Sequence, residues 1–363
     1  MEKFAFLIHP IQIDDVYRKY KFLKYLPEGW VEKLIEFIPP SMVSHITNIH
    51  GYHSQGEGWF IGVPLTSKQM MTLPEEKVMK KIVEAGKIAE ELGAGIVGLG
   101  AFTSVVGDAG ITVAKKLNIP VTTGNTYTVA AAFDATKEAC RLLGKEFADC
   151  EVAVVGANGS IGRICAELAS REVSRLRLVG RDRKKLEQLK EALMGDYPNK
   201  IIETTTSIEL GISSADVVVT VTSSIDDVIK AEYIKTGAVV CDVARPRDVS
   251  KAVQEKRKDV LVIEGGVIEV PKGVKFNFNF GFPDGLSYAC MAETMILSLE
   301  KKYENFSLGR EIDINKVDEI KRLADKHGFR LAGLRSFERV IDDTHIQGVL
   351  DAIERSIKLE NLS

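Results

Sequence analysis

The segment from Glu151 to Arg163, EVAVVGANGSIGR, constrains the fold of this chain more than any other. Its first part, Val152 to Val155, is an unbroken apolar run typical of a parallel strand that is buried on both faces. Three glycines follow, and then apolar residues at helical spacing, so the segment predicts a strand, a tight turn and a helix. In such a unit a pyrophosphate binds at the turn and the helix N-terminus. The segment therefore predicts a dinucleotide-binding unit near the middle of the chain.

Each glycine of this turn has its own predicted role. We expect Gly156 to make the turn, Gly159 to let the backbone approach the pyrophosphate, and Gly162 to let the helix pack closely on the strand. The predicted cofactor-binding residues of the turn are Gly156, Asn158, Gly159, Ser160, Ile161 and Gly162.

A basic cluster follows the second predicted strand, 176–179. Arg181 stands 25 residues after Gly156, where NAD-binding folds carry an acidic residue for the ribose 2′-hydroxyl. An arginine there suits the 2′-phosphate of NADP, because guanidinium and phosphate form paired hydrogen bonds. We therefore expect NADPH as the cofactor, with Arg181 and Arg183 near its phosphate. The alternative is that both arginines only begin a solvated helix.

Strand-like runs alternate with helical or polar stretches after this point, which is the pattern of a doubly wound parallel sheet. We predict an α/β fold with a Rossmann-type doubly wound parallel sheet, an N-terminal α/β substrate domain and a C-terminal helical region without strands. The expected domains are 1–124, 125–270 and 271–363. The expected strands are 95–99, 201–204, 217–220, 239–242 and 260–264, and the expected helices include 75–93 and 129–143.

Ligands of such sheets bind at the carboxyl ends of the strands. Thr222 and Ser223 follow one predicted strand, and Val243 and Ala244 follow the next, so all four are predicted to lie at the cofactor. Arg245 comes directly after them, and we leave open whether it binds cofactor or caps a helix.

The composition excludes several function classes. A net charge of −3 over 363 residues gives no excess of basic residues to neutralise nucleic-acid phosphates. No apolar run reaches the length of a membrane span, and the N-terminus lacks the layout of a signal peptide, so we expect a cytoplasmic protein. Five scattered cysteines without CxxC spacing argue against a disulfide framework and against a zinc site, and we expect no metal.

Cys290 is the candidate nucleophile. It lies in PDGLSYACMAE, where a turn leads into an apolar helix. If Ser287 is the N-cap, Cys290 falls in the first helical turn, where the helix dipole and unpaired N–H groups favour a thiolate. Glu293 would oppose this effect if it faced the sulfur. From local sequence alone, packing in the core is the alternative role for this cysteine.

The segment 288–310, YACMAETMILSLEKKYENFSLGR, resembles the fatty-aldehyde-forming long-chain acyl-[acyl-carrier-protein] (acyl-ACP) reductases of cyanobacterial type. The resemblance covers about residues 1–335. It implies that Cys290 accepts the acyl group as a thioester and that NADPH reduces this group to a fatty aldehyde. It also implies two partners, namely an acyl carrier protein or CoA thioester of a fatty acid, and an aldehyde-consuming enzyme. The other similar segments are 39–47, 98–104 (GLGAFTS), 122–128 (TTGNTYT), 156–162 and 326–329.

Thioester chemistry needs hydrogen-bond donors for the oxyanion of each tetrahedral intermediate. Ser104, Asn125 and Thr126, from the segments GLGAFTS and TTGNTYT, are the predicted donors. Local turn or helix capping is the alternative use of these side chains. The histidines lack a comparable partner pattern, and we expect His327 to cap or pack a helix end.

Two segments depart from the resemblance. The loop 105–110 does not follow the family pattern closely, so acyl-chain length or carrier preference is left open. Residues 336–363 extend beyond the likeness, and the apolar spacing from Val340 to Ile357 predicts a helix of unknown role.

Two other functions stay open. Asn125-Thr126 leading by a helix into the glycine turn also resembles the shikimate dehydrogenase architecture, which oxidises a carbinol with NADP and forms no covalent intermediate. However, Tyr127 stands where that family carries an aspartate. The remaining alternative is a noncatalytic NADP-binding protein.

Overall fold

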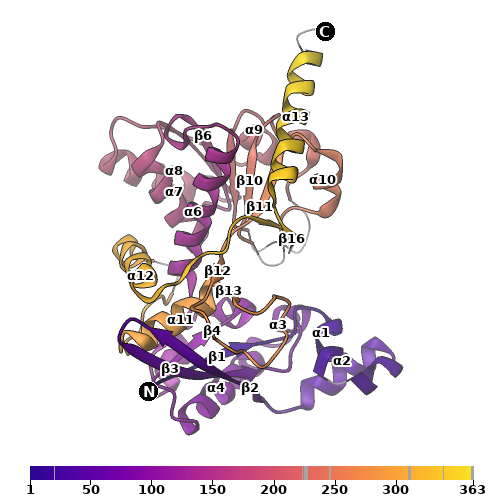
Figure 1. The fold of residues 1–363 in the computed structure, drawn as a ribbon, viewed down its shortest axis with the longest axis vertical. Coiled ribbons are helices and arrows are strands. Elements are labelled where there is room, and N and C mark those ends of the chain that lie inside the picture. The colour runs from indigo at the N-terminus through magenta and orange to yellow at the C-terminus, as the bar shows by residue number, and fades with distance from the viewer. Residues whose placement is uncertain are drawn as a thin grey trace. The chain divides into compact units, whose positions relative to one another are not determined.

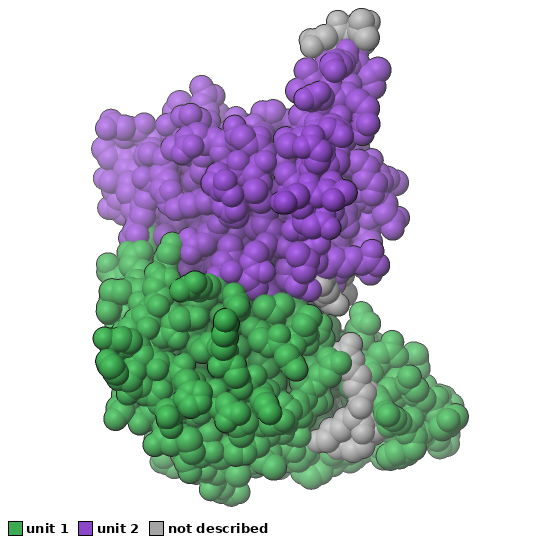
Figure 2. Space-filling view, in the orientation of Figure 1, with its two compact units in different colours: residues 1–127, 268–330 green, residues 128–267, 331–363 purple. Residues whose placement is uncertain are grey.

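The computed structural model describes residues 1–363 except 20, 223, 225–227, 245–246, 310–311, 338 and 361–363 (Figure 1). The described chain forms two compact units, each built from two separate stretches (Figure 2). The first comprises 1–127 and 268–330, and the second comprises 128–267 and 331–363.

This division differs from the three predicted domains, because 271–363 does not form a unit of its own. Helix α11, Ala289–Leu299, packs on the sheet of the N-terminal residues and is almost wholly buried. A helix that is apolar on all sides needs neighbours all round, so it belongs to the core of the first unit. Helix α13, Asp343–Glu360, belongs instead to the second unit.

The first unit is built on a five-stranded sheet of order β2-β3-β1-β4-β5. Strand β1 runs parallel to β3 and β4, β4 runs parallel to β5, and β2 and β3 form an antiparallel hairpin. The predicted helix 75–93 and strand 95–99 are confirmed as α4 and β4. Strands are β1 (Glu2–Ile8), β2 (Ser41–Gly51), β3 (Ser54–Gly62), β4 (Ile96–Leu99) and β5 (Val121–Thr122). Helices are α1 (Ile13–Lys19), η1 (Lys21–Tyr25), α2 (Glu28–Phe37), α3 (Ser67–Thr72), α4 (Glu75–Glu91), η2 (Ala101–Ser104), α5 (Ile111–Lys116), α11 and α12 (Ile314–His327).

The second unit holds a parallel sheet of order β11-β10-β9-β6-β7-β8. From the first strand in the sequence, β6, the chain moves outward to β8 on one side and to β11 on the other, which is the Rossmann arrangement. The predicted fold class and its strands are confirmed. The strands are β6 (Glu151–Val155), β7 (Arg175–Val179), β8 (Ile201–Thr205), β9 (Val217–Thr220), β10 (Val239–Asp242) and β11 (Leu261–Glu264). The helices are α6 (Asn125–Leu142, whose first three residues belong to the first unit), η3 (Phe147–Asp149), α7 (Ser160–Glu172), α8 (Arg183–Asp196), α9 (Ile208–Ile212), η4 (Ala231–Tyr233), α10 (Lys251–Lys256) and α13.

Short strands also occur beyond residue 271, where none was expected. Strands of two or three residues are too short to show an alternating pattern, so the sequence gives no sign of them. They are β13 (Leu286–Tyr288), β14 (Arg330–Leu331), β15 (Arg335–Ser336) and β16 (Arg339–Val340), and β13 and β14 pair with β12 (Val267–Glu269).

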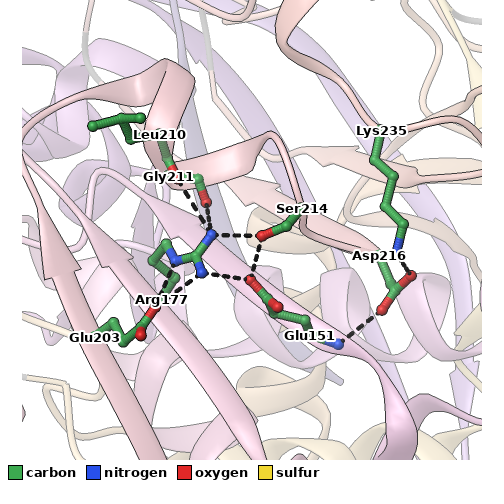
Figure 3. Close-up of polar contacts among 8 residues, drawn as sticks. All are labelled: Glu151, Arg177, Glu203, Leu210, Gly211, Ser214, Asp216 and Lys235. Carbon is green, nitrogen blue, oxygen red and sulfur yellow. Dashed lines mark hydrogen bonds and ion pairs between the residues drawn. The ribbon is translucent and has the colours of Figure 1, made fainter.

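Arg177, the middle residue of β7, joins three strands of the second unit (Figure 3). Its guanidinium pairs with Glu151 of β6 at 2.8 Å and with Glu203 of β8 at 2.9 Å. It also donates to the hydroxyl of Ser214 at 2.8 Å, and this hydroxyl donates to Glu151 at 2.8 Å. Nearby, Asp216 accepts from the backbone N–H of Glu151 at 3.0 Å. This polar network connects β6, β7 and β8 to the segment after α9.

No helix in the described part of the chain is long and apolar enough to cross a membrane.

Candidate active site

Cys290 is the second residue of α11, whose N-cap is Tyr288. The predicted N-cap, Ser287, is wrong, because strand β13 continues through Tyr288 and delays the start of the helix. The hydroxyl of Ser287 instead donates to the Tyr288 carbonyl at 3.3 Å. Cys290 still lies in the first turn, as expected. It is half-buried, whereas the other four cysteines are buried.

The segment 122–125 lies directly against this first turn. Gly124 has a left-handed φ of +75°, and a Cβ built on it would fall 2.2 Å from the Cβ of Cys290. Only glycine lets the backbone approach this closely. Two segments singled out from the sequence, TTGNTYT and YACMAE, therefore meet at Cys290.

Glu293, one turn after Cys290, is fully buried and joins three segments. Its carboxylate accepts from the hydroxyls of Thr122 at 2.5 Å and Ser307 at 2.9 Å. It also accepts from the backbone N–H of Tyr127, in the first turn of α6, at 2.8 Å. Burial raises the pKa of Glu293, while these donors act in the opposite direction. The sequence signal for this role was an acidic residue within an otherwise apolar helix.

The three predicted oxyanion donors lie in different settings. Asn125 begins α6 and directly follows Gly124, which places its backbone beside the first turn of α11. Thr126 is fully buried, and its hydroxyl has no hydrogen-bond partner among the described residues. Ser104 donates its hydroxyl to the Ala101 carbonyl at 2.6 Å, which is the local capping considered above. Ala101 has a left-handed φ of +46°, a conformation that is strained for a residue with a Cβ.

His9 connects the end of β1 to the segment GLGAFTS. Its Nε2 accepts from the backbone N–H of Phe102 at 3.1 Å, and its Nδ1 donates to the Pro10 carbonyl at 2.9 Å. Burial lowers the pKa of His9 to about 4. The neutral ring therefore holds the backbone at Phe102 to the end of β1. This role could not be inferred from a single histidine in the sequence.

A row of aromatic side chains leads up to α11. Phe282 contacts Tyr288, the N-cap of α11, with ring centroids 4.6 Å apart. Phe280 contacts Phe282 and Phe276, with ring centroids 6.1 and 5.0 Å apart. Phe280 is half-buried, so the row exposes some apolar surface. Its last ring, Tyr288, is two residues before Cys290 in the sequence. The alternating sequence FNFNFGF, 276–282, is the signal for this row.

The glycine turn of the second unit has the geometry that a dinucleotide needs. Gly156 has φ +92°, and a Cβ on Gly162 would lie 2.2 Å from the Gly156 carbonyl oxygen. Helix α7 begins at Ser160 after the N-cap Gly159, and the N–H of Arg163 donates to the Gly159 carbonyl at 3.0 Å. The N–H groups of Ser160, Ile161 and Gly162 thus lie at the helix N-terminus, where phosphates bind.

This turn lies at the point where the strand order reverses, between β6 and β9, as in nucleotide-binding sheets. Thr222 follows β9, and its backbone N–H and hydroxyl both donate to Asp248. Val243 and Ala244 follow β10, and the N–H of Ala244 donates to Asp242 at 3.0 Å. Asp248 and Asp242 therefore shape the two loops, a role that the sequence did not indicate. The predicted residue Ser223, and Arg245, lie outside the described residues.

Arg181 and Arg183 are exposed at the carboxyl end of β7. Asn158 binds the backbone of Asp182 through both ends of its amide, at 3.0 and 3.1 Å. Its side chain thus fixes the loop that carries Arg181 to the glycine turn. Arg183 is the first residue of α8, whose N-cap is Asp182.

Comparison with known proteins supports the dinucleotide-binding fold. Residues 137–264 match the Shikimate / quinate 5-dehydrogenase family. The chain is 29% identical to a long-chain acyl-[acyl-carrier-protein] reductase of Synechococcus elongatus (strain ATCC 33912 / PCC 7942 / FACHB-805) over 344 residues, which cover 88% of this chain and 95% of that protein.

Aminotransferase PigE of Serratia sp. (strain ATCC 39006) is 31% identical over 354 residues. The match covers 94% of this chain and 41% of PigE, so the chain spans about two fifths of that protein's length. Among solved structures, L-tryptophan dehydrogenase from Nostoc punctiforme aligns with a TM-score of 0.41 and 14% identity, over 98% of this chain and 89% of that one. The strand order of the second unit and the family match over 137–264 show the fold of an NAD(P)-dependent oxidoreductase.

Proposed function

We propose that this chain is an NADPH-dependent reductase that converts a long-chain acyl-ACP or acyl-CoA to a fatty aldehyde through a thioester on Cys290. The observation that carries the proposal is the contact between Gly124 and Cys290, because it brings the segments TTGNTYT and YACMAE together around a half-buried thiol. The similarity to the acyl-ACP reductase, which extends over most of both chains, supports the same substrate class.

In the first step the Cys290 thiolate attacks the carbonyl carbon of the acyl thioester. The bond from this carbon to the carrier sulfur breaks, and the carrier leaves as its thiol. The first turn of α11 favours the thiolate through its dipole and N–H groups. Asn125 and Thr126 are proposed donors to the oxyanion, although the Thr126 hydroxyl is buried and would have to turn toward the substrate.

In the second step a hydride reaches the acyl carbon, the bond to the Cys290 sulfur breaks, and the aldehyde leaves while the thiolate is restored. NADPH supplies this hydride when bound. The residues proposed to hold NADPH are those of the glycine turn, 156 and 158–162, with Arg181 and Arg183 near the 2′-phosphate. Thr222, Val243 and Ala244 are proposed at the nicotinamide end, together with Ser223.

We further propose that the aromatic row 276–282 contacts the acyl chain. The row consists of apolar rings, is partly exposed at Phe280, and ends at Tyr288 beside Cys290. A long hydrocarbon chain gains free energy by leaving water for such a surface. An aldehyde-consuming enzyme is a proposed partner, since the product is reactive.

The match of 137–264 to the shikimate and quinate dehydrogenases favours a second candidate, a carbinol oxidoreductase without a covalent step. This match covers nucleotide-binding elements and stops before Cys290. A noncatalytic NADP-binding protein is the third candidate. Both predict that no acyl group becomes attached to the chain.

The decisive experiment incubates the protein with acyl-ACP or acyl-CoA without NADPH and measures the intact mass. We expect one acyl adduct on the wild type and on Cys165→Ala, a buried control cysteine of α7, and none on Cys290→Ala. Added NADPH should remove the adduct and release aldehyde. An absent wild-type adduct, or an adduct that persists in Cys290→Ala, rejects the covalent mechanism.

A further inference from the structure

Helices α1, η1 and α2 form a small helical lobe within residues 11–37, of which residue 20 is not described, and the lobe lies at the side of the first unit's sheet (Figure 1). The lobe has a core of its own, made by Val16, Tyr17, Leu23, Val31 and Ile35. It nevertheless exposes several large apolar side chains. These are Tyr25 (90% exposed), Phe37 (80%), Trp30 (72%), Phe22 (66%), Leu34 (45%) and Leu26 (40%).

Helix α2 has two apolar faces. Val31 and Ile35, four residues apart, point into the core of the lobe and are buried. Trp30, Leu34 and Phe37 follow the spacing i, i+4, i+7, so they share a second face, and all three are exposed. A helix of a water-exposed protein normally carries one apolar face. Lys77 of α4 lies over the Phe37 ring, 5.7 Å from its centroid, but most of the surface of the second face is exposed.

The charges of α2 are sorted around these faces. Glu28, Glu32 and Glu36 follow i, i+4, i+8 and occupy a third side of the helix, about opposite the exposed apolar face. Glu32 pairs with Lys68 at 3.6 Å, and Glu36 pairs with Lys77. Acidic side chains are thus turned away from the exposed apolar face and are bound to lysines elsewhere in the unit.

Exposed basic side chains accompany the apolar ones in both α2 and η1. Lys33 is exposed and flanks the face formed by Trp30 and Phe37. In η1, exposed Lys21 and Lys24 alternate with Phe22 and Tyr25. Aromatic and aliphatic residues with lysines at their edge are the composition of protein segments that lie in the headgroup region of a bilayer.

We propose that the lobe 11–37 docks on an anionic lipid surface. Trp30, Leu34 and Phe37 enter the boundary between headgroups and acyl chains, and Lys21, Lys24 and Lys33 lie at the lipid phosphates. A second copy of the chain is a poorer occupant, because a two-fold contact through this face sets the same lysines against each other. This inference stands apart from the proposed function and does not require that Cys290 be catalytic.

The test is flotation of the full chain with vesicles of phosphatidylcholine alone or mixed with phosphatidylglycerol. We expect binding to the mixed vesicles that weakens with salt, and roughly fivefold weaker binding for each of Lys21→Gln, Lys24→Gln and Lys33→Gln. The double variant Trp30→Glu, Phe37→Glu should lose binding. Leu210→Glu, at a comparably exposed apolar residue of α9 (68% exposed), should bind like the wild type.

Tryptophan fluorescence adds an independent readout, since the chain has two tryptophans and only Trp30 is exposed, with Trp59 at 8%. Mixed vesicles should shift the emission to shorter wavelength. Trp30→Phe should abolish the shift and keep flotation. The proposal is overturned if the wild type does not float with the mixed vesicles, or if the double variant floats as well as the wild type. A dimer in solution that the double variant abolishes, without vesicle binding, would assign the face to a second copy instead.

Discussion

The Cα of Gly124 and the side chain of Cys290 occupy neighbouring positions that leave no room for another methyl group. A Cβ on Gly124 would lie 2.2 Å from the Cys290 Cβ and 2.3 Å from its Cα. A hydrogen bond joins the two segments nearby, because Glu293 of α11 accepts from the N–H of Tyr127, three residues after Gly124. The position of the thiol therefore depends on the absence of a side chain at residue 124.

Gly124→Ala should destabilise the fold and displace Cys290. The left-handed φ alone costs an alanine about 1–2 kcal/mol, and the overlap with α11 adds about 1–3 kcal/mol. Gly144→Ala is the matched control, because Gly144 has a similar φ of +69° and nothing within 4 Å of its Cβ position. Urea unfolding and the acyl adduct assay measure both effects. Equal losses of stability in the two variants would show that the contact with Cys290 carries no cost.

Glu293 should act as a positioning residue for Cys290. Glu293→Ala removes a buried acceptor for the Tyr127 N–H and leaves the Thr122 and Ser307 hydroxyls to bond with each other, 3.1 Å apart, which should lower the free energy of unfolding by about 1–3 kcal/mol. Glu293→Gln keeps an amide oxygen for the Tyr127 N–H and should cost about 1 kcal/mol. On the proposed function, the rate of adduct formation should fall steeply in Glu293→Ala and recover in Glu293→Gln. An unchanged rate of adduct formation in Glu293→Ala, or an equally low rate in Glu293→Gln, would argue against this role.

Arg181→Asp should weaken NADPH binding by roughly tenfold or more and leave NADH binding nearly unchanged, since a charge-assisted contact to phosphate is worth about 1.5–3 kcal/mol. Titration of the cofactor fluorescence measures both affinities. Arg175→Asp, at the other end of β7 and also exposed, is the control and should bind both cofactors like the wild type. Equal losses for the two cofactors would mean that Arg181 does not contact the 2′-phosphate.

The nucleotide-binding sheet could be predicted strand by strand because its signals are local. The central strands β6, β9, β10 and β11 are short, mainly apolar runs, and the turn at Gly156 has a fixed glycine spacing. What the sequence did not show is the support of this site. Asp248 binds Thr222 from 26 residues away, and Asn158 binds Asp182 from 24 residues away. Such pairs depend on which loops the sheet brings together.

The first unit was less predictable because its core is assembled from two stretches that are distant in the sequence, 1–127 and 268–330. The meeting of Gly124 with Cys290 joins residues 166 positions apart, as does the bond from Tyr127 to Glu293. Neither local periodicity nor charge pattern records such contacts. The N-cap at Tyr288 was missed for a related reason, since strand β13 pairs with residues distant in sequence and shifts the helix start.

His9 predicts a pH dependence of stability. Its pKa is lowered from 6.5 to about 4 in the folded chain, so between these values the unfolded chain binds a proton that the folded chain does not. By linkage, stability falls as the pH drops from about 6.5 toward 4. His9→Gln removes this titration and should flatten the pH profile of the urea midpoint in that range. An unchanged slope in the variant would show that other groups cause it.

Arg177→Met should lower the free energy of unfolding by about 2–3 kcal/mol, because the guanidinium is mostly buried and its removal leaves Glu151, with 18% of its side chain exposed, without its cation. Glu203→Gln removes a pair whose acid is 59% exposed, so it should cost less than about 1 kcal/mol. Urea midpoints with unchanged slopes measure the two losses. Because Arg177 and Glu203 lie in the middle of β7 and β8, whereas the glycine turn follows the carboxyl end of β6, NADPH affinity should stay at the wild-type value in both variants. If Arg177→Met unfolds no more easily than Glu203→Gln, or if it binds NADPH more weakly while folded, a purely structural role for Arg177 is contradicted.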